Sequence, residues 1–136
     1  MNAPSLDIKD IMVGKGLGLT FGRNLFVGLE PANPPDSVTV FDGPGGGFGP
    51  GYNPEERYEY RAVNVRVRAV RYEAGMKLAQ EIVKSLHKLS GTVVGQTLYT
   101  LIKAIDTPGL TGYDQNGRAW ITFNLEIQRR PVYVVT

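Results

Sequence analysis

The residues that could do chemistry in this chain are few. Its 136 residues include one histidine and no cysteine. Without cysteine there is no disulfide, no thiolate nucleophile and no cysteine-based metal site, and one histidine could serve a metal site only if subunits shared it. Lys84 and Gly91 lie one helical turn from His87, and neither is a carboxylate or a nucleophile. We therefore interpret His87 as a structural residue of a helix.

Two pairs of carboxylates stand close together in the sequence. Glu55 and Glu56 fall in a segment rich in glycine and proline, whereas Asp7 and Asp10 fall on a predicted surface helix. Two carboxyl groups act as acid and base only where their surroundings separate their pKa values. Neither pair has such a setting, so we interpret both as solvated charge. We expect no enzymatic activity, no metal and no cofactor.

The segment from Gly14 to Thr20, with the sequence GKGLGLT, resembles a phosphate-binding loop in composition only. Such a loop needs a strand before it and a helix after it, so that the helix N-terminus faces the anion. Here a predicted helix precedes the glycines and a predicted strand follows them. We therefore interpret this segment as a connector.

Four arginines lie on and around one predicted strand: Arg61, Arg66, Arg68 and Arg71. Arg66 and Arg68 share one face of that strand. Two interpretations stay open for them. They pair with a carboxylate on a neighbouring segment, either Glu126 or Glu30, or they project into solvent and contact phosphates.

One stretch, from Tyr60 to Leu89, positions these arginines. Apolar and polar residues alternate from Val63 to Ala69, which indicates a strand with one buried face. After Tyr72 the apolar residues follow helical spacing, at Met76, Ala79, Ile82, Val83, Leu86 and Leu89. We expect a helix from Tyr72 to Leu89 that ends with Gly91 as a left-handed cap.

Further elements are predicted on both sides of this stretch. A short helix covers Pro4 to Val13, with Ser5 as its cap. The expected strands are Arg23 to Glu30, Ser37 to Phe41, Gln96 to Ile105 and Arg118 to Gln128. We expect the first two to form a hairpin across a proline-rich turn. The pattern predicts an α+β fold: a single mixed, mostly antiparallel sheet with one long helix packed across one face and a short N-terminal helix.

We expect residues 1–136 to form one domain with a Gly/Pro-rich loop at 42–56 and a short tail at 131–136. The loop has too few apolar side chains to offset its ordering entropy, so we predict that it is exposed and mobile. Phe48 and Tyr52 are its large groups and its candidate partner anchors. The tail is apolar at Val132, Tyr133 and Val134, and we expect it to pack on its own domain or on a neighbour.

The bulk composition excludes several classes of function. The formal net charge is +2, which gives no strong field for nucleic acid or an anionic membrane. No apolar run is long enough to span a membrane, and the N-terminus lacks the order of a signal peptide. We expect a soluble protein made in the cytoplasm.

The order of elements resembles that of tail-terminator and minor capsid proteins of long-tailed bacteriophages, which complete the tail and join it to the head. The specific likeness is Val63 to Ala69 (VNVRVRA) running into Tyr72 to Ala79 (YEAGMKLA), followed by Ile121 to Ile127 (ITFNLEI). It covers about residues 5 to 130. The long glycine-rich segment departs from the pattern.

This resemblance implies a structural virion protein of the tail or neck, made in the host cytoplasm. It implies a homo-oligomeric ring, usually hexameric, that caps the tail tube and docks on head-connector or neck proteins. Phage DNA would pass through the lumen without sequence-specific binding, and no membrane is involved. The candidate interface residues are Phe48, Tyr52, Arg66, Arg68, Glu126, Val132, Tyr133 and Val134.

Two other classes stay open from the residues alone. A small enzyme would need a catalytic constellation, which the sequence lacks. A nucleic-acid-binding module, or another non-enzymatic assembly module, is the second. A nucleic-acid binder would bind DNA as a monomer with steep salt dependence.

Overall fold

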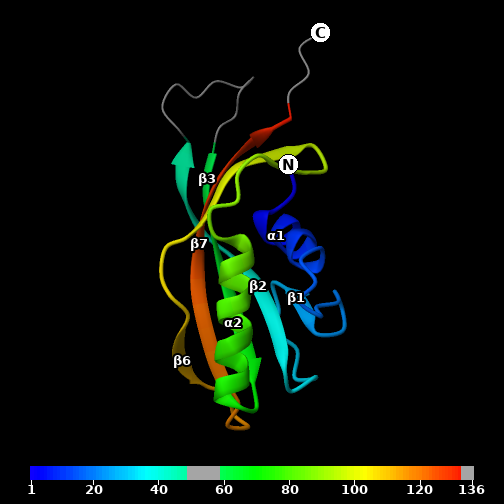
Figure 1. The fold of residues 1–136 in the computed structure, drawn as a ribbon, viewed down its shortest axis with the longest axis vertical. Coiled ribbons are helices and arrows are strands. Elements are labelled where there is room, and N and C mark those ends of the chain that lie inside the picture. Colours follow the sequence, from blue (N-terminus) through cyan, green and yellow to red (C-terminus); the bar gives the residue numbers. More distant parts are fainter. Residues whose placement is uncertain (49–58, 133–136) are drawn as a thin grey trace.

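The computed structural model describes residues 1–48 and 59–132, and Figure 1 shows a sheet with two helices on one of its faces. The helices are α1 (Pro4–Val13) and α2 (Tyr72–Leu86). The strands are β1 (Leu25–Val27), β2 (Ser37–Phe48), β3 (Glu59–Ala69), β4 (Thr92–Val94), β5 (Thr97–Ala104), β6 (Gly109–Tyr113) and β7 (Ala119–Pro131). The expected α+β class and the short N-terminal helix are therefore confirmed.

The seven strands form one mixed sheet with the order β1-β2-β3-β7-β5-β4, and β6 pairs with β7 beside β5. The long central strands β2, β3 and β7 are antiparallel to one another. Among the described strands the one parallel pair is β1 with β2. The hairpin expected from these two segments is thus wrong. Instead of turning back at once, the chain crosses one face of the sheet and enters β2 in the direction of β1.

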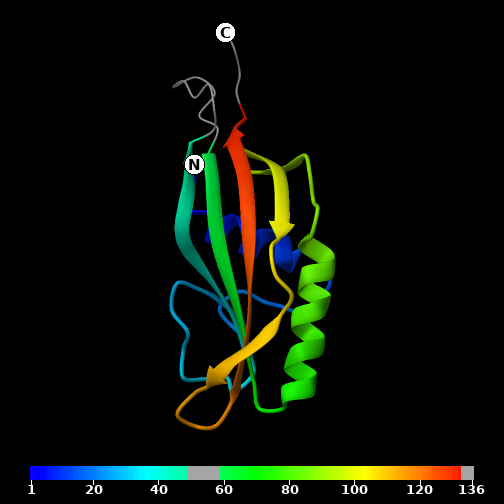
Figure 2. The same ribbon diagram turned by 90° about the vertical axis from the view of Figure 1, so that its left-hand side faces the viewer.

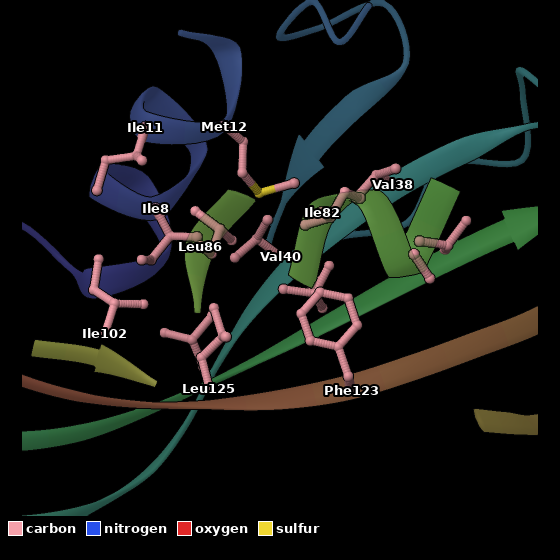
Figure 3. Packing of buried hydrophobic residues seen from close by; sticks show 14 of the residues in the cluster. Ile8, Ile11, Met12, Val38, Val40, Ile82, Leu86, Ile102, Phe123 and Leu125 are labelled. Atoms are coloured by element: carbon pink, nitrogen blue, oxygen red, sulfur yellow. The ribbon is translucent and has the colours of Figure 1, made fainter. Parts of the chain in front are cut away.

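The alternation predicted for β3 is confirmed, and β7 alternates in the same way. Val63, Val65 and Val67 are buried, and they face Leu125, Phe123 and Ile121 across the antiparallel register. Together with the apolar side of both helices they build one core, part of which Figure 3 shows. Each fully buried aliphatic side chain contributes about 2 kcal/mol of transfer free energy to folding, so this layer holds the helices on the sheet.

The helix α2 has the predicted buried face but not the predicted length. Ala79, Ile82 and Leu86 are buried. The helix spans 15 residues and ends at Leu86, so the long helix expected to reach Leu89 is not found. Lys88, with φ 64°, takes the left-handed conformation just after the helix, and Gly91, with φ 68°, is also left-handed but lies beyond the helix end and is not its cap. Two contacts of the following segment with β5 explain the early end: Lys88 N–H donates to Ile102, and Leu89 forms a bridge with Ile102.

The glycine-rich segment also differs from the expectation. The loop was expected to begin at Asp42, but β2 continues to Phe48 and pairs with β3 as far as Glu59. Strand pairing uses backbone groups, so glycines can join a ladder without burying side chains. The expected mobility of the loop concerns residues 49–58, which lie outside the described part. Two short strands, β4 and β6, were not expected at all.

Candidate assembly surfaces

We call the face of the sheet that the helices leave uncovered the outer face. On β3 it carries the even-numbered residues, including Arg66 and Arg68, and on β7 it carries Trp120. The segment 28–36 crosses the lower part of this face, on the side away from α2 in Figure 2. We call this segment the strap. The sequence-predicted arginines therefore lie beneath a part of their own chain.

Arg66 is held by two aromatic rings and one carboxylate. Its guanidinium carbon lies 4.5 Å from the centre of the Trp120 ring and 5.2 Å from that of Phe41. Its Nη1 donates to Glu30 Oε2 at 3.2 Å. Glu30 Oε1 also accepts from Trp120 Nε1 at 3.2 Å. A planar cation between two rings with an ion pair at its edge is attracted by all three groups.

Arg68 is fixed more tightly, and its side chain is 4% exposed. Its Nη2 donates to the carbonyl of Pro34 at 2.7 Å, and its Nε donates to the carbonyl of Pro35 at 3.2 Å. Its Nη1 lies 3.5 Å from Glu30 Oε1. Buried backbone carbonyls need a hydrogen-bond donor, and the Arg68 guanidinium supplies it for these two strap carbonyls.

These contacts decide between the earlier alternatives for pairing. Glu30 is the partner of both Arg66 and Arg68, as one alternative had it. The alternative pairing with Glu126 is wrong. Glu126 is exposed and lies opposite Ala62 and Lys103, several residue pairs along the strand from Arg66. The reason is that the strap brings Glu30 over the sheet, whereas Glu126 is fixed by the register of β7.

A third arginine, Arg118, ties the strap to the turn between β6 and β7. Arg118 donates from Nη1 to the carbonyl of Ala32 at 3.0 Å and from Nε to Asp114 Oδ2 at 2.6 Å. Desolvation opposes ionisation of Asp114, but hydrogen bonds from Arg118 and from the Asn116 N–H outweigh it, so the pKa of Asp114 lies below its ordinary value. This carboxylate therefore stays charged and orders the turn.

A buried polar cluster lies at the other end of the sheet, on the helix side. It joins Asp7 of α1, Tyr99 of β5, Arg129 of β7 and Glu59 of β3. Asp7 is 1% exposed, so the interpretation of Asp7 as solvated charge is wrong. Arg129 donates from Nε to Glu59 at 2.8 Å. Burial, together with the hydrogen bond to Asp7, raises the pKa of the Tyr99 hydroxyl well above its ordinary value.

The helix α1 begins differently from the prediction. Ser5 does not act as the cap, and the residue at the cap position is Ala3. Asp42 of β2 reaches the helix instead, because its Oδ1 accepts from the Ser5 N–H at 2.9 Å and its Oδ2 accepts from the Ser5 hydroxyl at 2.7 Å. A carboxylate at a helix N-terminus is favoured by the exposed N–H groups and the helix dipole. The contact ties α1 to β2.

The sheet offers free strand edges on both of its borders. On one border the described β1 pairs only with Val38 to Val40, so the stretch of β2 from Phe41 to Phe48 extends beyond it. On the other border β6 pairs with β7 through one of its edges. Free edges with unpaired backbone groups can accept a strand from another chain.

The remaining sequence-predicted residues have different positions. Phe48 lies at the end of β2, opposite Glu59. Val132 is exposed, and its N–H donates to the carbonyl of Gln96 at 2.7 Å, so the tail begins on its own chain. Tyr52, Tyr133 and Val134 lie outside the described residues. Among the interface candidates within the described residues, the structure brings together Arg66 and Arg68, which share Glu30 as their partner.

Two candidate sites for small groups keep structural roles. His87 is half-buried, and its Nδ1 accepts from the Ala104 N–H at 3.0 Å, which joins the end of α2 to β5. The Gly14–Thr20 segment follows α1 and precedes β1, the order that argues against a phosphate loop.

Within residues 1–48 and 59–132 no three His, Cys, Asp or Glu side chains are grouped as metal ligands. Neither of the two helices described above combines the length and apolarity of a membrane span.

The sequence reasoning missed Tyr99 and Arg129 altogether. The odd-numbered residues of β7 point inward, and Arg129 is the next odd-numbered residue after Ile127. This position in the alternation was the one sequence signal that Arg129 is buried. It did not indicate the partners of Arg129, which lie on three other elements.

Comparisons with known proteins give the chain its family. The family model described as bacteriophage tail terminator protein matches residues 7–130. A search of curated proteins found no matching sequence. Among solved structures, a chain from the virion of a native gene transfer agent particle is similar, with a TM-score of 0.63 and 10% sequence identity. The alignment covers 94% of this chain and 95% of that chain, and at this identity it shows a shared fold. The chain therefore belongs to the bacteriophage tail terminator proteins, which are structural proteins of the virion.

Proposed function

We propose that copies of this chain form a closed ring on the end of a phage tail tube, where the ring stops tube growth and docks on the head-connector or neck proteins. The observation that carries this proposal is the family match over residues 7–130. The ring works by shape and contact, and phage DNA passes through it without sequence-specific binding. The chain is made in the host cytoplasm before it joins the virion.

The two borders of the sheet support a ring. One border ends in β1 and the free stretch of β2, and the other ends in β4, β5 and β6. Because the two borders differ, a contact between them is heterologous, and such a contact builds a ring where its rotation closes. A hexamer is the ring size that the family resemblance implies.

The partner-facing residues are part of the same proposal. Phe48 and Tyr52 serve as anchors for a tail or neck protein, and Val132, Tyr133 and Val134 pack on a neighbouring copy. The exposed carboxylate of Glu126 lies on the open upper part of the outer face. Arg66 and Arg68 support the ring by bracing the strap, since Glu30 and the strap carbonyls occupy both guanidiniums.

The nucleic-acid-binding alternative draws no support from this arrangement. Its residues would be Arg66 and Arg68, and both are engaged within the chain. A protein that bound DNA through free arginines would lose affinity steeply as salt rises. The proposal expects the isolated chain to bind duplex DNA weakly already at about 50 mM salt, without the steep fall in affinity towards about 200 mM that free arginine–phosphate contacts would give.

Complementation of a phage from which the gene has been deleted tests the proposed function. We expect tails of uncontrolled length, or full heads and tails that fail to join, and rescue by the wild-type gene supplied in trans. Electron micrographs of the lysate distinguish these products. Normal virions from the deletion phage would refute the proposal. The exposed substitution Gln80→Ala on α2 serves as a control that should rescue fully.

A further inference from the structure

A row of apolar residues crosses the whole sheet at one level. Leu25 of β1 pairs with Val38 of β2, and the row continues through the central strands to β6. At one end, Phe21 forms a bridge with Leu25. The complete row in register order is Phe21, Leu25, Val38, Val67, Ile121 and Leu110.

The row is buried in its middle and exposed at both ends. Phe21 is 52% exposed and Leu110 is 43% exposed, whereas the four residues between them are buried. Tyr113, which follows Leu110 on β6, is 59% exposed. Large apolar groups gathered at an edge are typical of contact surfaces. The row therefore ends in an apolar group on each of two opposite borders, near β1 and β6 in Figure 1.

The two segments that hold the ends of the row carry charges of opposite sign. Residues 14–24, which include Phe21, contain Lys15 and Arg23 and no acidic residue. Residues 105–117, which include Leu110, contain Asp106 and Asp114 and no basic residue. Asp114 is paired with Arg118, whereas Asp106 is exposed and its two oxygens accept from the backbone N–H and the side-chain amide of Asn124, which are neutral donors. Opposite charges beside apolar contacts favour one pairing of surfaces over others.

We propose that the β6 border of one copy, with Leu110 and Tyr113, docks on the Phe21 border of the next copy. This inference rests on the proposed ring and names the surfaces that form it. Because Phe21 and Leu110 end the same row of the sheet, joining them continues this row from one copy into the next.

Cysteine cross-linking in phage particles tests the contact, since the chain has no cysteine of its own. The phage carries Phe21→Cys and Leu110→Cys together, the particles are purified and oxidised, and the protein is separated without reductant. A disulfide forms only where the two Cα atoms come within about 7 Å. We expect a ladder of multimers that ends at the number of copies in the ring, and monomer after reduction.

The control pair is Phe21→Cys with Val93→Cys. Val93 is exposed on β4, on the same border as β6 but opposite Leu98, so it should give no ladder. Particles that contain the Phe21 and Leu110 pair and yield only monomer would overturn the contact while leaving the ring proposal intact. Normal virions from the deletion phage would instead refute the ring itself.

A second variant tests the same contact without oxidation. Leu110→Glu places a charge on an exposed position of β6, so the isolated chain should melt like wild type. In complementation it should reduce phage titre at least tenfold, because the charge enters the apolar contact. Val93→Glu is the matched control and should rescue. Full rescue by Leu110→Glu would contradict the inference.

Discussion

The Tyr99 hydroxyl donates a hydrogen bond to Asp7 Oδ2 in the interior, and this bond fastens α1 to β5. Arg129 Nη1 donates to the same hydroxyl at 3.2 Å and to the carbonyl of Asn2 at 2.6 Å. One end of the sheet is thus held to the N-terminal segment by polar contacts in addition to the apolar packing of Ile8 and Met12. Buried polar groups are costly when a partner is removed, so the cluster makes clear predictions.

Replacing Tyr99 with Phe should lower the free energy of unfolding by about 2 kcal/mol at pH 8, because Asp7 loses its buried donor. Denaturant unfolding measures the change. Tyr113→Phe is the control, since Tyr113 is exposed, and it should unfold like wild type. Equal stability of the Tyr99→Phe variant and wild type would show that the bond contributes nothing net.

The same hydroxyl predicts an alkaline dependence of stability. Burial raises the pKa of Tyr99 in the folded chain, while an unfolded tyrosine ionises near pH 10. Its stabilising contribution is complete below the unfolded pKa and is lost as pH rises from about 10 towards the folded pKa, at about 1.4 kcal/mol per pH unit. The stability difference between wild type and Tyr99→Phe should therefore shrink between pH 9 and pH 11. A constant difference would contradict the prediction.

This cluster marks a limit of sequence reasoning. The alternation of β7 puts one set of apolar residues on its buried face: Ala119, Ile121, Phe123, Leu125 and Ile127. The same alternation puts Arg129 inward, but a lone arginine on a core face makes sense only once Asp7, Glu59 and Tyr99 are known to meet it. Local period is a property of one segment, whereas this site depends on four segments.

The missed strands have a related cause. β4 has three residues and β6 has five, with two glycines in β6. Such segments show no period and are fixed by the neighbour they pair with. The strap was missed because short connections usually return as hairpins. Here Arg66, Arg68 and Arg118 hold the segment across the outer face, and the arginines themselves were the visible signal.

Replacing Gly75 with Ala should destabilise the chain even though Ala favours a helix. A Cβ at position 75 would lie 2.7 Å from Ala69 Cβ and 2.7 Å from Ile121 Cδ1, so α2 would have to move off the sheet. Overpacking of this kind costs about 1–3 kcal/mol, which exceeds the roughly 1 kcal/mol gained in helix propensity. Thermal unfolding checks the sign. Gly14→Ala, where φ is −77° and the nearest atom is 3.5 Å away, should show no loss.

Replacing Ile82 with Asp should cost several kcal/mol, on the order of 4, because it places a charge without a partner at a fully buried position of α2. The neighbouring change Glu81→Asp is the control, since Glu81 is exposed. Circular dichroism at rising temperature compares the two. Melting of the Ile82→Asp variant at the wild-type temperature would mean that the buried face of α2 is assigned wrongly.

Arg66 and Arg68 provide a matched pair for the role of the strap. Arg68→Ala leaves strap carbonyls without a donor and a buried part of Glu30 without its cation, and it should cost about 3 kcal/mol. Arg66→Ala removes a partly exposed ion pair and the stacking on Trp120, and it should cost about 1 kcal/mol. Arg66→Lys keeps the charge but loses the planar stacking, so its free energy of unfolding should fall between those of Arg66→Ala and wild type.

Denaturant unfolding ranks the three variants, and complementation followed by measurement of the DNA content of the particles gives their DNA retention. If the arginines lined the DNA passage instead, all three would unfold like wild type and would differ only in retention or ejection of DNA.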